Sequence, residues 1–275
     1  MLPFSNRGFP FYRNFVSRCK TYYIMARQEG IIKLNGRIGD LTFYKTRDGY
    51  LAREKGGVSA SRIAGDPRFE RTRENMAEFG RATKAGKFMR IAFKTLTSQL
   101  ADPGMSNRLM SQMLKVIQAD SVNERGLRMV LDAETELLTD FEFNIKAPIR
   151  TTINVPYEAL IDRETGLLSI VLPAFSARDL INSPQGATHY KLSAASAAIN
   201  FEEEHFQLDV VESEVIGVKD IAVAATRLDC HLAAANANPL FLLFGISFYQ
   251  RVNQVDYPLS NGAFNGLTLA KIQGV

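Results

Sequence analysis

The chain has 275 residues, enough for one large domain or two modest ones, and a hydrophobic share of 46% is ordinary for a chain that buries a core. It has two cysteines, Cys19 and Cys230, which excludes a disulfide-rich secreted scaffold and indicates free thiols in a reducing compartment. The net charge of +4 is unevenly divided, since residues 1–100 hold 20 Lys and Arg against 8 Asp and Glu, while residues 101–275 hold 13 against 21. This division indicates a basic surface for a polyanion, or two complementary surfaces on one molecule.

The N-terminal 24 residues are basic and aromatic, and they lack the continuous apolar segment of a signal peptide. We interpret them either as an extension upstream of a natural start at Met25 or as a docking arm. No stretch approaches the ~20 apolar residues that a membrane-spanning helix needs. We therefore expect no membrane span, and a location in the cytoplasm or within an assembled particle.

The segment after Gly30 has the pattern of short strands joined by tight turns. Residues 31–34 read as strand-like and lead into Asn35-Gly36, a strong turn signal. Residues 41–46 and 50–55 are β-prone and flank Arg47-Asp48-Gly49, which predicts a hairpin. A flexible loop is expected to follow this hairpin.

Two amphipathic helices are predicted next. Asp66 followed by Pro67 is a helix start, with an N-cap acid before a proline at the first helical position. Apolar residues then recur at helical spacing, although Gly80 and Gly86 weaken the middle and favour a kink or a split there. The second helix and a further short helical or irregular segment are expected over residues 109–117 and 127–138.

The remainder of the chain is rich in β-prone runs separated by Pro, Gly and Asn. These runs cover residues 148–155, 167–172, 187–201, 206–211, 221–232 and 240–252, with one or two more strands in the tail. Frequent turns without room for helical crossovers favour an antiparallel sandwich. We thus predict an α+β fold, in which an N-terminal β-hairpin and amphipathic helices precede an antiparallel β-sandwich-like C-terminal domain. The expected divisions are residues 1–24, 25–140 and 141–275.

Residues 80–87, which contain two glycines and end in a lysine, resemble a phosphate-binding loop but do not match its motif. The motif needs four residues between its glycines and a hydroxyl after the lysine, but here five residues separate Gly80 from Gly86 and Phe88 follows Lys87. The segment also lies inside a helical pattern. We interpret it as a patch of small residues against which another helix packs.

Two further groups resemble reactive sites. Glu202, Glu203 and Glu204 precede His205 in a ligand-rich run, but neighbouring strand residues point to opposite faces, so a solvated turn is the better interpretation. Asp229-Cys230-His231 is contiguous on an apparent strand, whereas catalytic triads are assembled from separate segments. We interpret Cys230 as a buried thiol, and we expect no enzyme, cofactor, metal or small-molecule substrate.

Part of the chain resembles a known but uncharacterised family. The segment MARQ, then GIIKLNGRIGD and FYK, then DGYLAREKGG and RTREN, resembles a family of Gram-negative bacterial proteins without an assigned activity. The resemblance is strongest over residues 25–90 and weaker through the β-rich half. Members begin at a position like Met25, which implies that residues 1–24 are an extension. The resemblance carries no functional residues to this chain.

Charge and the lack of a catalytic pattern favour a structural or assembly protein that forms homo-oligomers, with a subunit of a phage-like or filamentous particle as one form of it. A basic arm of one copy would dock on the acidic β-domain of another. The residues predicted for the basic surface are Lys45, Arg47, Arg53, Lys55, Arg81, Lys84 and Lys87. Those predicted for the acidic surface are Glu202, Glu203, Glu204 and Asp209.

The alternative is a nucleic-acid-binding protein that uses the same basic hairpin and helix. Tyr44 and Tyr50, which lie beside Lys45, Arg47 and Arg53, would stack bases in that case, or would instead stabilise the paired strands. Glu70, Glu74 and Glu78 make the first half of the predicted helix mixed in charge. Both functions stay open from the sequence.

Overall fold

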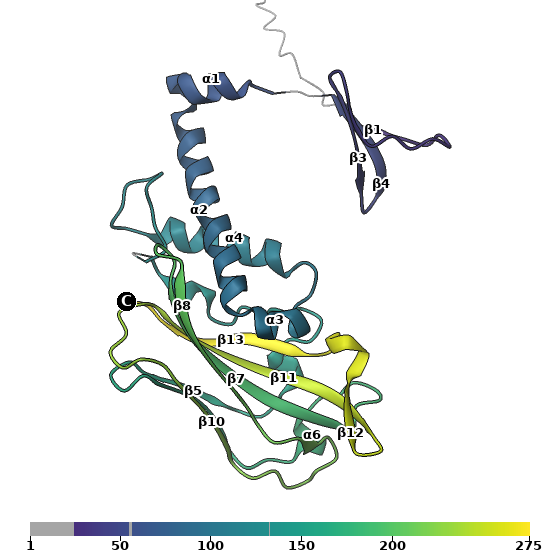
Figure 1. The fold of residues 1–275 in the computed structure, drawn as a ribbon, viewed down its shortest axis with the longest axis vertical. Coiled ribbons are helices and arrows are strands. Elements are labelled where there is room, and N and C mark those ends of the chain that lie inside the picture. The colour runs from purple at the N-terminus through teal and green to yellow at the C-terminus, as the bar shows by residue number, and fades with distance from the viewer. Residues whose placement is uncertain (1–24, 55–56, 132) are drawn as a thin grey trace, which may run out of the picture. The chain divides into compact units, whose positions relative to one another are not determined.

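The computed structural model describes residues 25–54, 57–131 and 133–275, which belong to two compact units, Met1–Gly65 and Asp66–Val275 (Figure 1). Helices and antiparallel sheets together give the predicted α+β fold. The division falls at Gly65, whereas the change of sequence pattern predicted a boundary near residue 140. The reason is that the helices after residue 66 share one hydrophobic core with strands of the β-rich half.

The first unit is a four-stranded antiparallel sheet in the order β1-β4-β3-β2, followed by a short helix. Its elements are β1 (Met25–Arg27), β2 (Gly36–Ile38), β3 (Leu41–Thr46), β4 (Gly49–Glu54) and α1 (Ala60–Gly65). The predicted hairpin is confirmed, since Thr46 pairs with Gly49 across a two-residue turn. Gly49 has φ +116°, a conformation that favours glycine. Residues 31–34 form a bend and irregular chain instead of the expected strand.

The helical part of the second unit begins at the predicted cap. Its first elements are η1 (Pro67–Phe69), α2 (Glu70–Ala92), α3 (Lys94–Leu100) and α4 (Met105–Ala119). The Asp66 carboxylate accepts a hydrogen bond from Arg68 N at 3.0 Å. Helix α2 continues through both of its glycines and ends one residue before the fully buried Phe93. At Gly86 a Cβ would lie 3.7 Å from Met110 Cα, which agrees with the predicted close packing of a second helix.

The strands of the second unit form two antiparallel sheets. The larger has the order β12-β11-β7-β8, with β13 also paired to β11 and β9 to β7, and the smaller has the order β10-β6-β5. Their bounds are β5 (Glu158–Asp162), β6 (Leu167–Leu172), β7 (His189–Asn200), β8 (His205–Glu212), β9 (Ile216–Gly217), β10 (Thr226–His231), β11 (Leu240–Val252), β12 (Val255–Pro258) and β13 (Gly266–Gln273). Four short helical turns accompany them: η2 (Thr135–Leu138) and α5 (Ile149–Thr152) precede β5, α6 (Ala177–Leu180) lies between β6 and β7, and η3 (Leu259–Gly262) lies between β12 and β13.

The second unit has three layers, because both faces of its larger sheet are covered. In Figure 1 the helices α2, α3 and α4 lie over one face of β7, β11 and β13, and β5 and β10 lie along the other. Along β11, Phe241 and Leu243 join the core beneath the helices, while Leu242 and Phe244 join the core beneath the smaller sheet. This double burial explains the continuous apolar run of β11, since a strand covered on both faces does not alternate.

A second strand prediction, in the β-rich half, was also wrong. Residues 148–155 were expected to be extended, but Ile149–Thr152 form helix α5, and only Ile153 pairs as a strand residue, in an isolated bridge to Ile181. Ile149 and Thr152 are both buried, so burial accounts for apolar and β-branched residues in a helical turn. No described helix is long and apolar enough to cross a membrane.

Candidate functional site

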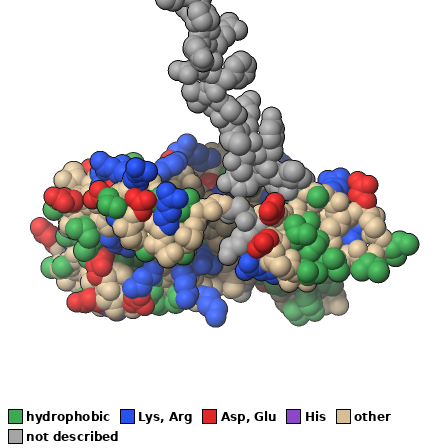
Figure 2. Space-filling view, turned by 90° about the horizontal axis from the view of Figure 1, so that it is seen from above, with side chains coloured by type: hydrophobic (Ala, Val, Ile, Leu, Met, Phe, Trp, Pro, Cys, Tyr) green, Lys and Arg blue, Asp and Glu red, His purple; other side chains and the backbone are tan. Residues whose placement is uncertain are grey.

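The described part of the first unit has an exposed surface and no buried side chain. None of its described side chains, over residues 26–54 and 57–65, is buried. Ile31 and Ile32 are 103% and 80% exposed, and further exposed apolar residues are Leu34, Ile38, Leu41 and Val58. Figure 2 shows hydrophobic side chains gathered at the surface of this unit. An exposed apolar surface of this kind is typical of an interaction site.

The two exposed isoleucines are carried by a loop that is fixed at its base. The Gln28 side-chain amide binds Leu34 in both directions, accepting from Leu34 N at 2.8 Å and donating to Leu34 O at 3.3 Å. The same amide donates to Leu51 O on β4 at 3.0 Å. The loop therefore presents Ile31 and Ile32 on a base that is tied to the sheet.

The hairpin cations lie over the hairpin tyrosines. Lys45 Nζ is 5.5 Å from the centre of the Tyr50 ring, and Arg53 Cζ is 5.4 Å from the centre of the Tyr44 ring. These contacts support the interpretation in which the tyrosines stabilise the strands. Arg47 is exposed in the β3–β4 turn, and Lys55 lies outside the described residues.

Helix α2 and the start of α3 carry a stretch without acids. Between Glu78 and Asp102 the chain has five cations and no Asp or Glu. The structure divides these cations into three groups with different surroundings, so they do not form one continuous basic face. The five cations are Arg81, Lys84, Lys87, Arg90 and Lys94.

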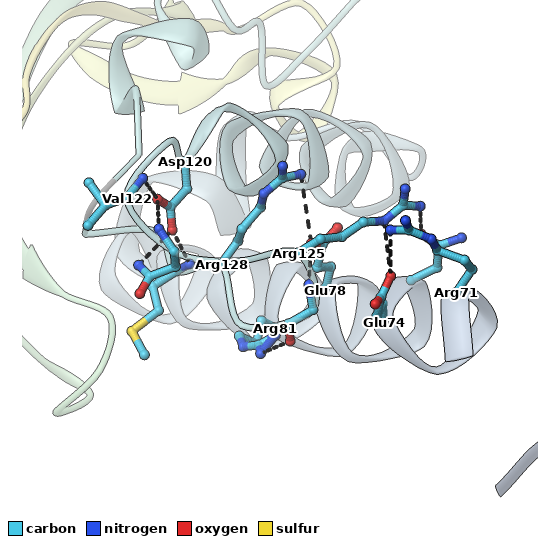
Figure 3. Close-up of polar contacts among 12 residues, drawn as sticks. Arg71, Glu74, Glu78, Arg81, Asp120, Val122, Arg125 and Arg128 are labelled. Carbon is cyan, nitrogen blue, oxygen red and sulfur yellow. Dashed lines mark hydrogen bonds and ion pairs between the residues drawn. The ribbon is translucent and has the colours of Figure 1, made fainter. Parts of the chain in front are cut away.

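Arg81 is engaged inside the protein (Figure 3). It donates to Gly126 O, and Gly126 N donates to the Glu78 carboxylate at 2.9 Å. Glu78 is 1% exposed, and Arg128 lies 3.9 Å from it. Arg81 therefore fixes the loop after α4 to helix α2 and is not a free surface cation, a role that sequence reasoning missed because Gly126 is 45 residues away.

Lys84 forms an ion pair with the turn between β7 and β8, called the acidic turn here because it contains Glu202, Glu203 and Glu204. Lys84 Nζ lies 2.7 Å from Glu204 Oε1, with both side chains exposed. The turn itself is held by Asn200, whose side-chain oxygen accepts from Glu202 N at 3.0 Å and Glu203 N at 2.9 Å. Glu202 and Glu203 are exposed. Three of the four residues predicted for the acidic surface are therefore exposed at this turn, and Glu204 already has a cation beside it.

Asp209, the fourth residue predicted for the acidic surface, has a structural role within the second unit. It accepts a hydrogen bond from His231 N at 2.7 Å and so joins β8 to β10. In the neighbouring triplet, Asp229 accepts from Ser169 Oγ at 2.5 Å and from Arg227 Nε at 2.7 Å. Cys230 is free and fully buried, as predicted, and burial raises the pKa of its thiol to about 11. Among the described residues no group of three or more potential ligands could hold a metal ion.

The last three cations surround a hollow of about 340 Å³ between α2, α3 and α4. It is lined by Lys87, Arg90, Ile91, Lys94, Thr97, Ser98, Met105 and Ser106. No acidic residue is among these lining residues. The basic surface predicted from the sequence included Lys87 but not the hollow, because the hydroxyls come from α3 and α4. The stretch without acids between Glu78 and Asp102 is the sequence signal that could have located it.

The chain was compared with protein-family models, with curated proteins and with solved structures, and none of the three comparisons gave a match.

Proposed function

We propose that this chain is a non-enzymatic structural or assembly protein, which self-associates by docking the first unit of one copy on the second unit of another. The observation that carries the proposal is the first unit's four-stranded sheet, in which no described side chain is buried while Ile31 and Ile32 project from a fixed loop. A small sheet needs a hydrophobic face or an element packed against it to be stable. A second copy supplies such a cover.

Charge supports the choice of a second copy as the partner. Residues 25–65 hold 8 Lys and Arg against 4 Asp and Glu, and residues 66–275 hold 21 against 25. The first unit is thus basic and the second is acidic, so unlike units attract and like units repel. Such a contact uses two different surfaces of the molecule and gives rings or filaments, according to whether the rotation closes.

The acidic turn is the part of the second unit that we propose as the docking point for basic residues. Glu202 and Glu203 are exposed, and their backbone is fixed by Asn200. Glu204 would exchange its exposed Lys84 partner for a cation of the second copy, which costs little because exposed ion pairs are weak. On the basic side, Arg47 is exposed in a tight turn and has no ion pair among the described residues.

The test is light scattering of the full chain over a range of concentration and salt. The wild type is expected to form oligomers at low salt that dissociate as salt rises. The double variant Ile31→Ser/Ile32→Ser should be monomeric, and Arg47→Glu should raise the concentration needed for assembly. Ile221→Ser and Lys219→Glu, exposed changes of the same kind in the second unit, should leave assembly unchanged.

A wild-type monomer at low salt and high concentration would overturn the proposal. Oligomers that persist in Ile31→Ser/Ile32→Ser would also overturn it, because the apolar loop would then have no part in assembly. If these isoleucines instead pack on the second unit of their own chain, the double variant will lower the thermal stability of a protein that is monomeric throughout.

A further inference from the structure

The hollow between α2, α3 and α4 has the composition of an anion site. Its rim carries Lys87, Arg90 and Lys94, three cations from two different helices. We propose that it binds the phosphate group of an organic phosphate, either a free nucleotide or the backbone of a nucleic-acid strand. This inference goes beyond self-assembly and involves neither the first unit nor the acidic turn.

The cations of the hollow have no ion-pair partner among the described residues. Among the described residues, neither Lys87 nor Lys94 has an ion-pair or hydrogen-bond partner, and Arg90 donates to Ser106 Oγ at 3.0 Å and to Gly86 O at 3.3 Å. Lys87 lowers the pKa of Glu204, but the ion-pair partner of Glu204 is Lys84. Three cations gathered without acids repel one another, and a bound anion relieves that repulsion.

The hydroxyl groups add donors of the kind that phosphate oxygens accept. Ser106 Oγ accepts its hydrogen bond from Arg90, so its own hydrogen stays available for a ligand. The Thr97 hydroxyl has no hydrogen bond among the described residues, and it faces the same hollow from α3. Charged donors together with hydroxyls suit a phosphate group, whose peripheral oxygens accept several hydrogen bonds.

The apolar residues of the hollow favour a phosphate that carries an organic body. Met105 is buried in its wall, and Ile91 is 47% exposed at its rim. A bare inorganic ion makes no use of an exposed isoleucine, whereas a base or a sugar packs against one. The ligand class that matches cations, hydroxyls and an apolar rim together is therefore a nucleotide or a nucleotide unit of a strand.

The hollow is a product of the break between α2 and α3. Phe93 is fully buried and separates the two helices, so that Lys94 begins a new helix. Gly86 of α2 faces the backbone of α4 at Met110, where an added Cβ would be in ordinary van der Waals contact. The redirected α3 and the start of α4 thus bring Thr97 and Ser106 to the same hollow as Lys87. The sequence alone cannot show this convergence.

The test uses the full chain and two fluorescent probes, a labelled single-stranded DNA of mixed sequence and a labelled adenosine nucleotide. Binding is followed by anisotropy across a salt series. We expect Lys87→Ala/Lys94→Ala to weaken binding roughly tenfold or more. The slope of the logarithm of the binding constant against the logarithm of the salt concentration should fall by about two, because two phosphate contacts are lost. The matched control is Lys115→Ala/Lys219→Ala, which removes the same charge from two other positions of the second unit.

The two probes distinguish the sources of the phosphate. Binding of the nucleotide that requires Lys87 and Lys94 supports a free nucleotide, and binding of the strand alone with the same requirement supports a nucleic-acid backbone. Failure of both probes at low salt would overturn the inference, as would an equal loss in the control, which would indicate unspecific attraction. Binding by the variant Ile31→Ser/Ile32→Ser separates this result from self-assembly, because that variant retains the hollow.

Discussion

Lys84 and Glu204 are 120 positions apart in the chain, and their charged atoms lie 2.7 Å from each other in the structure. The pair joins helix α2 to the turn between β7 and β8. Beside it, the centre of the Phe88 ring lies 6.5 Å from the centre of the Phe201 ring and 5.8 Å from that of the Phe206 ring, and both pairs are packed edge to face. An apolar contact and an ion pair therefore fix the same helix to the same turn.

These two contacts should differ greatly in their contribution to stability. Phe88→Ala is expected to lower the free energy of unfolding by about 3 kcal/mol, because it removes a buried ring and leaves a cavity. Lys84→Ala, at an exposed ion pair, should leave the urea midpoint nearly unchanged. Urea unfolding of both variants checks this, and a larger loss in Lys84→Ala than in Phe88→Ala would contradict it.

Gly126 and Gly80 give a matched pair of glycine substitutions. Gly126 has φ +87°, and a Cβ there would lie 2.9 Å from Glu74 Cγ, so Gly126→Ala should cost about 1–3 kcal/mol and loosen the loop held by Glu78. Gly80 lies within α2, and a Cβ added there would meet nothing within 4 Å, so Gly80→Ala should gain about 0.5–1 kcal/mol. Thermal unfolding checks this: the midpoint temperature should fall in Gly126→Ala and rise in Gly80→Ala.

Glu142 should make stability depend on pH. Burial raises the pKa of its carboxyl from 4.5 to about 7, and the nearby Asp140 carboxylate adds to the rise. The native state therefore holds a proton that the unfolded chain releases between about pH 4.5 and 7, and the free energy of unfolding falls as pH rises through that window. The loss should be on the order of 2 kcal/mol, measured by urea unfolding at each pH.

Glu142→Gln should remove this fall, because the amide does not titrate. The variant is expected to match the wild type near pH 5 and to exceed it at pH 8, while Glu134→Gln at an exposed position keeps the wild-type profile. Asp102 cannot produce the same effect, since its hydrogen bond with Arg108 lowers the pKa of its carboxyl to about 2, outside that window. A wild-type stability that is flat from pH 5 to 7 would show that the Glu142 carboxyl is not perturbed.

Cys230 should be unreactive in the folded protein. It is 0% exposed, and burial raises the pKa of its thiol to about 11, so neither access nor the thiolate form favours attack. In the variant Cys19→Ser, where Cys230 is the sole thiol, Ellman's reagent should react only as urea unfolds the chain. Rapid stoichiometric reaction in native buffer would place Cys230 at the surface.

Local patterns predicted the elements whose cause is local. The Arg47-Asp48-Gly49 turn predicted the hairpin of β3 and β4, and Asp66 with Pro67 predicted the helix start, because turn and cap preferences depend on neighbouring residues. The apolar run at residues 240–252 predicted β11 with its observed bounds. The strand predicted over residues 148–155 was wrong, because a buried helical turn and a buried strand carry the same residue types.

The sequence by itself determined the α+β class, the hairpin and the excess of cations before residue 100. Only the tertiary structure decided how each cation is used: Arg81 holds a loop, Lys84 faces Glu204, and Lys87 lines an acid-free hollow. It also decided that the helices share a core with β7 and β11. The physical reason is that charge and periodicity are properties of neighbouring residues, whereas the partner of a side chain depends on contacts between distant segments.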